Sequence, residues 1–536
     1  MTSTFHGLET ARRGLTAQQA ALYVTGQNVA NANTLGYSRQ RVNMAAETAY
    51  PNPALNREQI PGQLGTGVKA DSIERVRESF LDVQYRSESR KLGFWNGKAD
   101  GLGKIQDVMN ELEDTGLADS IDSFWQSLQE LAVNSVNSGG KAVVRERGIA
   151  LADTFTYLNG SLNMVRSDLK NELSVTVENI NSLLGSIDQL NKQIAAIEPH
   201  GYLPNDLYDS RDVLIDELSS IMNIKVDYVK NGGNAQAQAM GTAVIKLNNG
   251  STEPMTLVDS NTVNLLTVTY NGEDEAVDTV QIGGNMVPSA TFTSEGKLLS
   301  LLQTYGYMNT DGEMTGDLPD MLRELDHMAY TFATKFNEVH VDGLGAKELA
   351  AWKEALKEDP NADIEAFDKK ILFFVDEENA TPNFDTIKGY AGRIQVSDEI
   401  KESYDNIANA SKETPNEGDS SNLLKLITVF TEKYNYKDAL QDSSTDAEKD
   451  YLGAYLQSVI GTLAVKTNQA DRLAENSVTL LQNVSDRRSS VSAVSLDEEM
   501  TNMVQFQHAY NASARMITMI DECLDKIING LGVGGR

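Results

Sequence analysis

The sequence predicts a multidomain α+β protein. We expect a long helical bundle, with coiled-coil helices at both termini, to carry an inserted β-rich outer domain. Three observations lead to this prediction. Apolar residues recur at helical spacing near both ends and through residues 72–222. From 223 to 300 the pattern changes to alternation broken by Asn-Gly turns. The chain has 536 residues, which is too long for one compact core.

Residues 1–40 predict an N-terminal helix with a narrow apolar seam. One apolar residue stands at every seventh position: Leu8, Leu15, Leu22 and Val29. A stripe this narrow is typical of a coiled coil rather than of a helix that covers a globular core. We therefore expect this helix to pair with another helix.

An asparagine-rich turn follows the seam. Asn28, Asn31 and Asn33 can bind nearby backbone groups and tolerate left-handed conformations, while Gly36 permits a positive φ. Tyr37 can then anchor the chain as it leaves the turn. We predict that seam and turn together serve assembly.

Residues 495–536 predict a C-terminal helix of matching pattern. Ser495 can cap it, and Glu498 three residues later completes a capping box. Its apolar stripe consists of Leu496, Met500, Met503, Phe506, Tyr510, Ala514, Ile517 and Leu524. Matching narrow stripes indicate that the first and last helices pair and that further neighbours cover them.

The middle of the chain divides into five regions. Residues 41–222 and 421–494 predict two parts of a helical core domain, whose clearest helix spans 162–197 and stops before Pro199. Residues 223–300 predict the β-rich outer domain, and 301–345 a return to helix. Residues 346–420 form a mixed, acidic outer insertion with a strand predicted at 371–375.

Composition excludes several classes of partner. The 46 basic and 77 acidic residues leave a net charge of −31, which argues against nucleic acid and anionic lipid. No apolar run is long enough for membrane insertion. The single cysteine, Cys523, excludes an internal disulfide. The first residues lack the apolar core of a cleaved secretory signal.

The residues also indicate no catalytic, cofactor or metal site. No two of the five histidines stand at a metal-binding helical spacing, and no phosphate loop or nucleophile elbow is present. The strongest acidic grouping is 205–212, where Arg211 lies among three aspartates. Without a calcium-loop pattern, we interpret it as helix-start capping with Arg211 offsetting the acids. We predict that the chain is not an enzyme.

Two segments carry a family resemblance. Residues 26–40, GQNVANANTLGYSRQ, resemble the N-terminal signature shared by flagellar rod, hook and hook-associated proteins. Residues 488–500, RSSVSAVSLDEEM, together with 505–515, QFQHAYNASAR, are similar to the C-terminal signature of the hook-associated protein 1 family. Each segment alone indicates only the broader axial family, whereas both together, with the chain length and 205–212, indicate hook-associated protein 1.

The resemblance implies a structural role in motility. Members of this family leave the cytoplasm through type III export without a cleaved signal peptide and lie outside the cell in the bacterial flagellum. They form the junction between hook and filament, as a ring of like subunits next to the hook protein and a second junction protein. It also implies an export chaperone, which we expect to bind the C-terminal helix in a groove.

Two alternatives remain at this point. Another axial protein of hook or rod type would share each terminal signature. A secreted adhesin or enzyme could use the β-rich region and 346–420 as its functional head. A structural subunit should have no metal requirement and no deep polar pocket where titratable groups converge.

Overall fold

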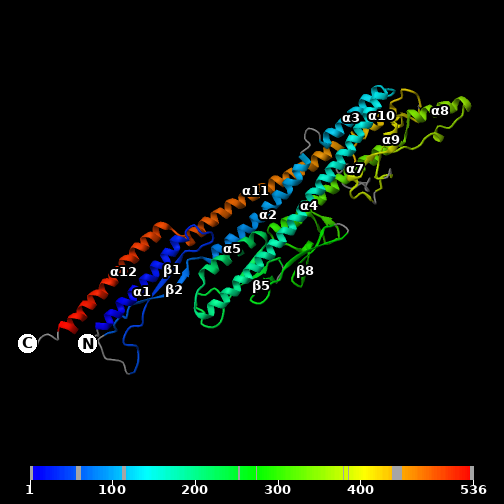
Figure 1. Cartoon of the computed structure of the whole chain (residues 1–536). Coiled ribbons are helices and arrows are strands. Elements are labelled where there is room, and N and C mark those ends of the chain that lie inside the picture. The colour runs from blue at the N-terminus through cyan, green and yellow to red at the C-terminus, as the bar shows by residue number, and fades with distance from the viewer. Residues whose placement is uncertain are drawn as a thin grey trace, which may run out of the picture.

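The structure is a computed structural model that describes residues 4–55, 62–110, 116–250, 254–272, 275–377, 380–383, 386–413, 415–436 and 450–530. The molecule is a long rod with both termini at the same end (Figure 1). None of the helices in the described ranges combines the length and apolarity that a membrane crossing requires. The predicted fold class, a multidomain α+β protein dominated by long helices, is confirmed.

The terminal end of the rod is a pair of helices. Helix α1 (Thr4–Ala30) packs along α12 (Leu496–Asp525), whose last residues widen into a π-helical turn at Lys526–Gly530. The helices run antiparallel, because Gly7 lies near Ile520 and Gly14 near Ser513. We call α1 and α12 the terminal pair.

A two-stranded ribbon lies against α1. Strands β1 (Gln40–Ala46) and β2 (Val68–Arg75) are antiparallel, with a bulge between Asn43 and Met44. The prediction of a helical core domain over 41–222 is therefore wrong for its first part. The strands are half-exposed and joined by the long connection 47–67, so neither strong alternation nor a short hairpin turn marks them in the sequence.

The centre of the rod is a bundle of long helices, which we call the core bundle. Its members are α2 (Ser79–Asn110), α3 (Leu117–Val133), α4 (Ser138–Ile197), α5 (Asn205–Ile221) and α11 (Leu452–Ser492). Asn137 caps α4 by accepting from the N–H groups of Gly139 and Gly140. The predicted helix 162–197 is thus the second half of a 60-residue helix that stops, as predicted, before Pro199.

Two sheets lie beside α4 (Figure 1): one is antiparallel, and the other is mixed, because one of its strand pairs is parallel. The first has β3 (Ile224–Val229), β4 (Thr242–Leu247) and β5 (Met255–Val258) in sequence order. The second contains β6 (Leu266–Tyr270), β7 (Val277–Ile282), β8 (Asn285–Pro288), β9 (Tyr307–Met308) and β10 (Met314–Thr315). The strands predicted from alternation at 224–229 and 265–270 correspond to β3 and β6.

The far end of the rod combines short elements with α7. The elements at this end are α7 (Asp317–Val341), β11 (Gly343–Gly345), α8 (Ala346–Glu358), β12 (Phe374–Val375), β13 (Gln395–Val396), α9 (Asp398–Glu402), β14 (Ala408–Ser411) and α10 (Ser421–Thr428), whereas α6 (Lys297–Tyr305) packs on α2 and α4 in the core bundle. Phe373 and Phe374 pack on Phe124 of α3 and Phe336 of α7. The region 346–420 therefore contributes to the hydrophobic core as well as to the surface. Only the last two residues of the predicted strand 371–375 pair, with β13.

Candidate assembly interface

Small residues let the two helices of the terminal pair approach closely. A Cβ atom at Gly7 would lie 3.3 Å from Ile520 Cδ1, and one at Gly14 would lie 3.2 Å from Ser513 Oγ. At those positions only glycine leaves the neighbouring side chain undisturbed. Farther along α1, Ala21 is buried. The contact surface of α1 is therefore a row of small side chains.

The predicted N-terminal seam lies beside this row. Leu8, Leu15, Leu22 and Val29 are all half-buried. The residue just before each of them, namely Gly7, Gly14, Ala21 and Asn28, belongs to the contact surface or is buried. Sequence reasoning missed this row because it followed large apolar residues; the seven-residue recurrence of small residues was the available signal.

The predicted C-terminal stripe divides into two groups. Six members are half-buried: Met503, Phe506, Tyr510, Ala514, Ile517 and Leu524. The other two, Leu496 and Met500, are 49% and 52% exposed, and Val504 four residues later is 50% exposed. Glu499 is the one buried residue among the described side chains of α12. The terminal pair thus leaves an apolar row of Leu496, Met500 and Val504 uncovered.

The asparagine turn is held by Asn28. Its Oδ1 accepts from the backbone N–H of Gln40 at 3.0 Å and from the Tyr37 hydroxyl at 2.9 Å, while its Nδ2 donates to Gln40 O at 2.8 Å. Burial, followed by the charges of nearby carboxylates, raises the pKa of Tyr37 and keeps its phenol a donor. One buried amide therefore ties the end of α1 to the start of β1.

The other turn residues have different roles. Asn31 donates to Gln27 O and accepts from the Thr34 hydroxyl, which shapes the turn locally. Asn33 is exposed. Gly36 has a φ of +78°, and a Cβ there would lie 2.1 Å from Val213 Cγ2 on α5. The turn is thus pressed against the core bundle.

Arg39 connects the turn to the start of α12. Its Nη1 lies 2.6 Å from Glu498 Oε2 and its Nε 2.8 Å from Glu499 Oε1. Ser495 caps α12 by accepting from the N–H of Glu498, as predicted. The carboxylate of Glu498, which was expected to complete a capping box, is directed to Arg39. A charge partner 459 residues away competes for it, and sequence spacing does not reveal such a partner.

Three aspartates on one face of α5, which we call the acidic row, bind segments from elsewhere in the chain. Asp209 accepts from Ser38 N at 3.0 Å, Ser38 Oγ at 2.7 Å and Arg75 Nη1 at 2.7 Å. Asp212 lies 2.9 Å from Arg75 Nη1 and 3.0 Å from Arg77 Nη1. Asp216 lies 2.7 Å from Arg488 Nη2 and 2.7 Å from Arg86 Nε.

Burial and neighbouring arginines have opposite effects on the pKa of an aspartate in the acidic row. Burial alone would raise the pKa of Asp212, but Arg77, Arg75 and Arg86 outweigh it and lower that pKa. Arg211 also lowers the pKa of Asp212, in line with its predicted offsetting role, but its Nη1 donates to Asn191 Oδ1 and Gly241 O. The ion pairs of the row are made by arginines more distant in sequence. Within the described ranges, no group of three or more His, Cys, Asp or Glu residues could hold a metal ion.

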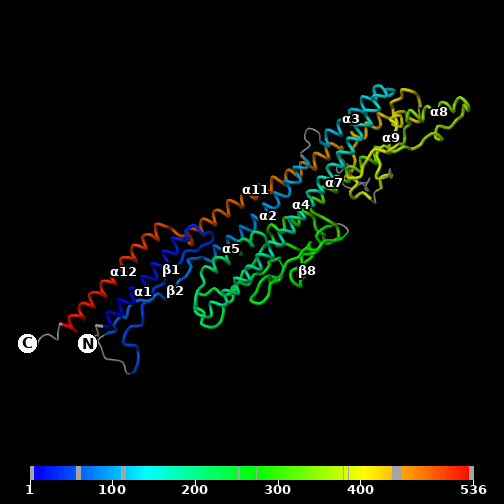
Figure 2. Tube along the Cα trace, viewed as in Figure 1, coloured from blue at the N-terminus to red at the C-terminus, as the bar shows by residue number. Residues whose placement is uncertain are grey.

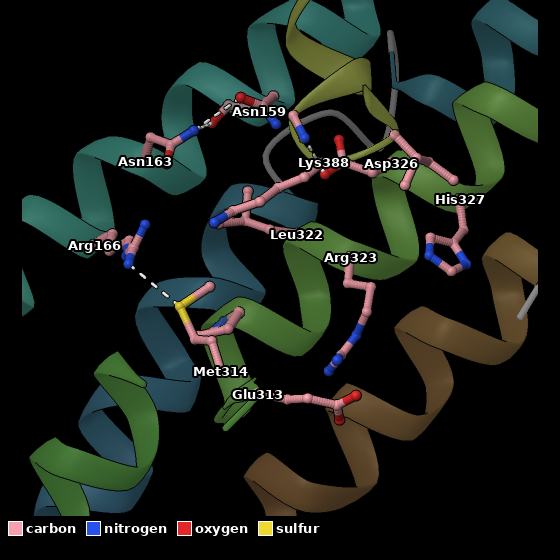
Figure 3. Close-up of a pocket in the computed structure, with 13 residues that line it drawn as sticks. Asn159, Asn163, Arg166, Glu313, Met314, Leu322, Arg323, Asp326, His327 and Lys388 are labelled. Carbon is pink, nitrogen blue, oxygen red and sulfur yellow. Dashed lines mark hydrogen bonds between the residues drawn. The ribbon is translucent and has the colours of Figure 1, made fainter. Parts of the chain in front are cut away.

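A separate pocket of about 360 Å³ lies between α4, α7, β10 and the 386–389 loop (Figure 3). Arg166, Arg323, His327 and Lys388 line it, although most of its lining surface is apolar. Asp326 accepts from the N–H groups of Gly389 and Ala391, and burial raises its pKa to about 6.

The contacts of these pocket residues join parts of the fold. The two bonds to Asp326 hold the 386–392 segment on α7. Arg323 pairs with Asp320 one turn earlier, and the Arg166 guanidinium lies over the Tyr305 ring and 3.4 Å from Met314 Sδ. The described geometry therefore accounts for Asp326, Arg323 and Arg166 as structural contacts.

Comparison with known proteins covers the whole chain. Residues 102–350 match the helical domain of the flagellar hook-associated protein FlgK, residues 487–530 the C-terminal part of flagellar basal body rod FlgEFG proteins, and residues 8–37 a flagella basal body rod protein family. The last two matches explain why each terminal signature alone indicates only the axial family.

Individual proteins agree with these matches. The chain is 45% identical to flagellar hook-associated protein 1 of Bacillus subtilis (strain 168) across the full length of both, and 25% identical to that of Escherichia coli (strain K12) across 97% of this chain and 99% of the other. The structure of the flagellar hook junction protein FlgK from Burkholderia pseudomallei matches 77% of this chain and all of its own, with a TM-score of 0.50 and 13% identity, which shows a shared fold. Because the identity to the Bacillus subtilis protein extends over the full length of both chains, this chain belongs to the flagellar hook-associated protein 1 family, as its two terminal signatures predicted.

Proposed function

We propose that this flagellar hook-associated protein is a structural subunit of the junction between hook and filament, and that it assembles through the terminal pair without catalysing a reaction. The observation that carries the proposal is the uncovered apolar row of α12. A helix with one buried residue among its described side chains gains little from its own chain, so it requires neighbours to bury its apolar surface.

The proposed partners are like subunits in a ring, the hook protein and a second junction protein. Family membership supports the flagellar setting. The relative from Burkholderia pseudomallei is itself described as a hook junction protein. Two uncovered surfaces support several neighbours at once: the apolar row on α12, and the opposite side of α1, where Phe5 and Tyr23 are 64% and 75% exposed.

We further propose that an export chaperone binds α12 before assembly. Met503, Phe506, Tyr510 and Ile517 provide the apolar stripe that a groove would accept. In the structure these side chains are partly covered by the terminal pair, so the chaperone and α1 compete for one face. Export without a cleaved signal places the protein outside the cell, and a chain with a single cysteine carries no internal disulfide that would resist unfolding during passage.

Co-sedimentation with isolated hooks tests the junction proposal. The full-length chain should pellet saturably, and a chain that lacks residues 1–40 and 496–536 should stay in the supernatant. Met500→Asp should weaken pelleting because it places a charge in the apolar row. Val478→Asp on α11 is the matched control, since Val478 is also 50% exposed. Absence of pelleting by the full-length chain, or equal loss in both variants, would contradict the proposal.

The chaperone proposal has its own test. Tyr510→Asp and Ile517→Asp should each reduce binding of the cognate chaperone in a pull-down, and a synthetic peptide of Thr4–Ala30 should compete with it. Thr501→Asp, on an exposed position of the same helix, should bind normally. Normal binding and normal motility in the two variants would refute the assignment.

A further inference from the structure

Three connections of the chain meet at Arg39, where the terminal pair and its ribbon join the core bundle; the first links α1 to β1, and the other two lead into the core bundle. They are 37–40, 75–79 and 492–495. The N–H of Arg39 donates to Ser492 O at 2.8 Å, and the N–H of Val76 donates to Arg39 O at 2.8 Å. A single residue therefore joins the three connections through its backbone, while its side chain binds Glu498 and Glu499 of α12.

The direction of α12 is not set by helical continuity. Helix α11 ends at Ser492, Ala493 is extended with φ −74° and ψ 156°, and α12 starts after the cap at Ser495 (Figure 2). A lone extended linker can turn freely, since one or two residues absorb the change in φ and ψ. Contacts made across the break must therefore hold α12 in its orientation.

The acidic row supplies such contacts from the core side. Asp209 binds the first connection through Ser38 and the second through Arg75, Asp212 binds the second through Arg75 and Arg77, and Asp216 binds Arg488 just before the third. The side chains of Arg75, Asp209 and Asp212 are 5%, 8% and 3% exposed. Moving the first or the second connection would leave buried charges without partners, which is strongly unfavourable.

We propose that Arg39 and the acidic row form a rigid joint that sets the orientation of the terminal pair relative to the core bundle. Arg39 and Asp209 are its positioning residues: they act through the segments they hold and need not touch a neighbouring subunit. The importance of this orientation rests on the proposed function, because subunits in a junction must present their terminal helices at one fixed angle.

Distance measurement between spin labels tests the joint. Labels are placed at Glu217→Cys on α5 and His508→Cys on α12, both exposed positions, in a Cys523→Ser background. The labelled chain is diluted with unlabelled chain and bound to isolated hooks. We expect one narrow distance distribution for the otherwise unaltered chain, and a distribution about twofold wider or more for Arg39→Gln and for Asp209→Asn.

Arg41→Gln is the matched control. Arg41 stands two residues later, on β1, and pairs with Glu74 in the ribbon. The Arg41→Gln variant should keep the narrow distance distribution between the two labels. Thermal unfolding separates positioning from simple stabilisation: a lowered melting temperature with an unchanged distribution in the folded protein would overturn the proposal. Because Asp209 is buried and its variant can fail to fold, the half-exposed Arg39 provides the decisive comparison.

The outcome also separates this inference from the proposed function. If the unaltered chain pellets with hooks but gives a broad distribution, the joint is wrong and the junction role remains. If the chain does not pellet, the junction role fails, and the same label pair in the free chain tests the joint. A narrow distance distribution that Arg39→Gln widens would support the joint. A broad distribution in both the unaltered chain and the variant would refute it.

Discussion

Gly14 of α1 faces Ser513 of α12 so closely that a Cβ atom at position 14 would lie 3.2 Å from Ser513 Oγ. This contact shows how the terminal pair is built, because close approach of two backbones requires small residues on at least one of them. Antiparallel pairing also places Ile520 of α12 against Gly7, so a large side chain of α12 meets a small residue of α1.

Enlarging residue 14 should therefore separate the helices. We expect Gly14→Leu to lower the free energy of unfolding of the terminal pair by about 1–3 kcal/mol through overpacking. Amide hydrogen exchange in α12 measures the effect. Gly26→Leu is the matched control, since no atom lies within 4 Å of a Cβ there and the gain in helix propensity is the same. Equal exchange in both variants would contradict the packing argument.

Asn28 is expected to be the most sensitive residue of the turn. Asn28→Ala removes the partners of the Tyr37 hydroxyl and of both backbone groups of Gln40, which should cost about 1–3 kcal/mol. The backbone amide of Gln40 should exchange faster, and denaturant unfolding should shift to lower concentration. Asn33→Ala, at an exposed position of the same turn, should leave both unchanged. An unaltered exchange rate at Gln40 would refute the role of Asn28.

Gly36 should be coupled to Val213. Gly36→Ala meets two penalties, a positive φ that costs about 1 kcal/mol in a residue with a Cβ and a clash with Val213 Cγ2. In a Val213→Ala background the clash disappears and the strain remains. A double-mutant cycle on thermal unfolding should thus give a coupling of about 1 kcal/mol or more. Additive effects would show that the turn does not press on α5.

His340 predicts a pH dependence of stability. Its ring is buried, its Nδ1 donates to Ile371 O at 2.8 Å and its Nε2 accepts from Ala408 N–H at 3.1 Å, so the bond at Nε2 requires the neutral form. Burial lowers its pKa to about 4, although the bond to Ile371 acts in the opposite direction. The unfolded chain takes up a proton below about pH 6.5, whereas the folded protein does not until about pH 4. The contribution is therefore complete above pH 6.5 and is lost as pH falls through this window.

The measurement is the difference in unfolding free energy between the unaltered chain and His340→Gln, followed from pH 7 to 4. The difference is needed because Asp326, with a pKa raised to about 6, contributes with opposite sign in the same range. The advantage of the unaltered chain should shrink by roughly 1 kcal/mol per pH unit. A constant difference across the window would show that His340 is not held neutral.

Local patterns in the sequence were sufficient for much of the fold. The seven-residue recurrence of Leu8, Leu15 and Leu22 predicted α1, and the alternation at 224–229 predicted β3, because helical and strand periods are properties of consecutive residues. The two terminal signatures led to the family for the same reason. The ribbon of β1 and β2 was not predicted, because half-exposed strands with a long connection leave only a weak periodic signal.

The tertiary structure alone decided which distant groups meet. Arg39 binds Glu499 across 460 residues, and Arg75 binds Asp209 across 134, and no spacing in the chain encodes either pairing. The same holds for Phe373, which lies in the strand predicted at 371–375 but whose packing on Phe124 in the core no local pattern reveals. The sequence by itself determined the helices, the strands with clear alternation and the family; folding decided the joint, the small-residue contact and the uncovered apolar row, because these depend on packing geometry rather than on local periodicity.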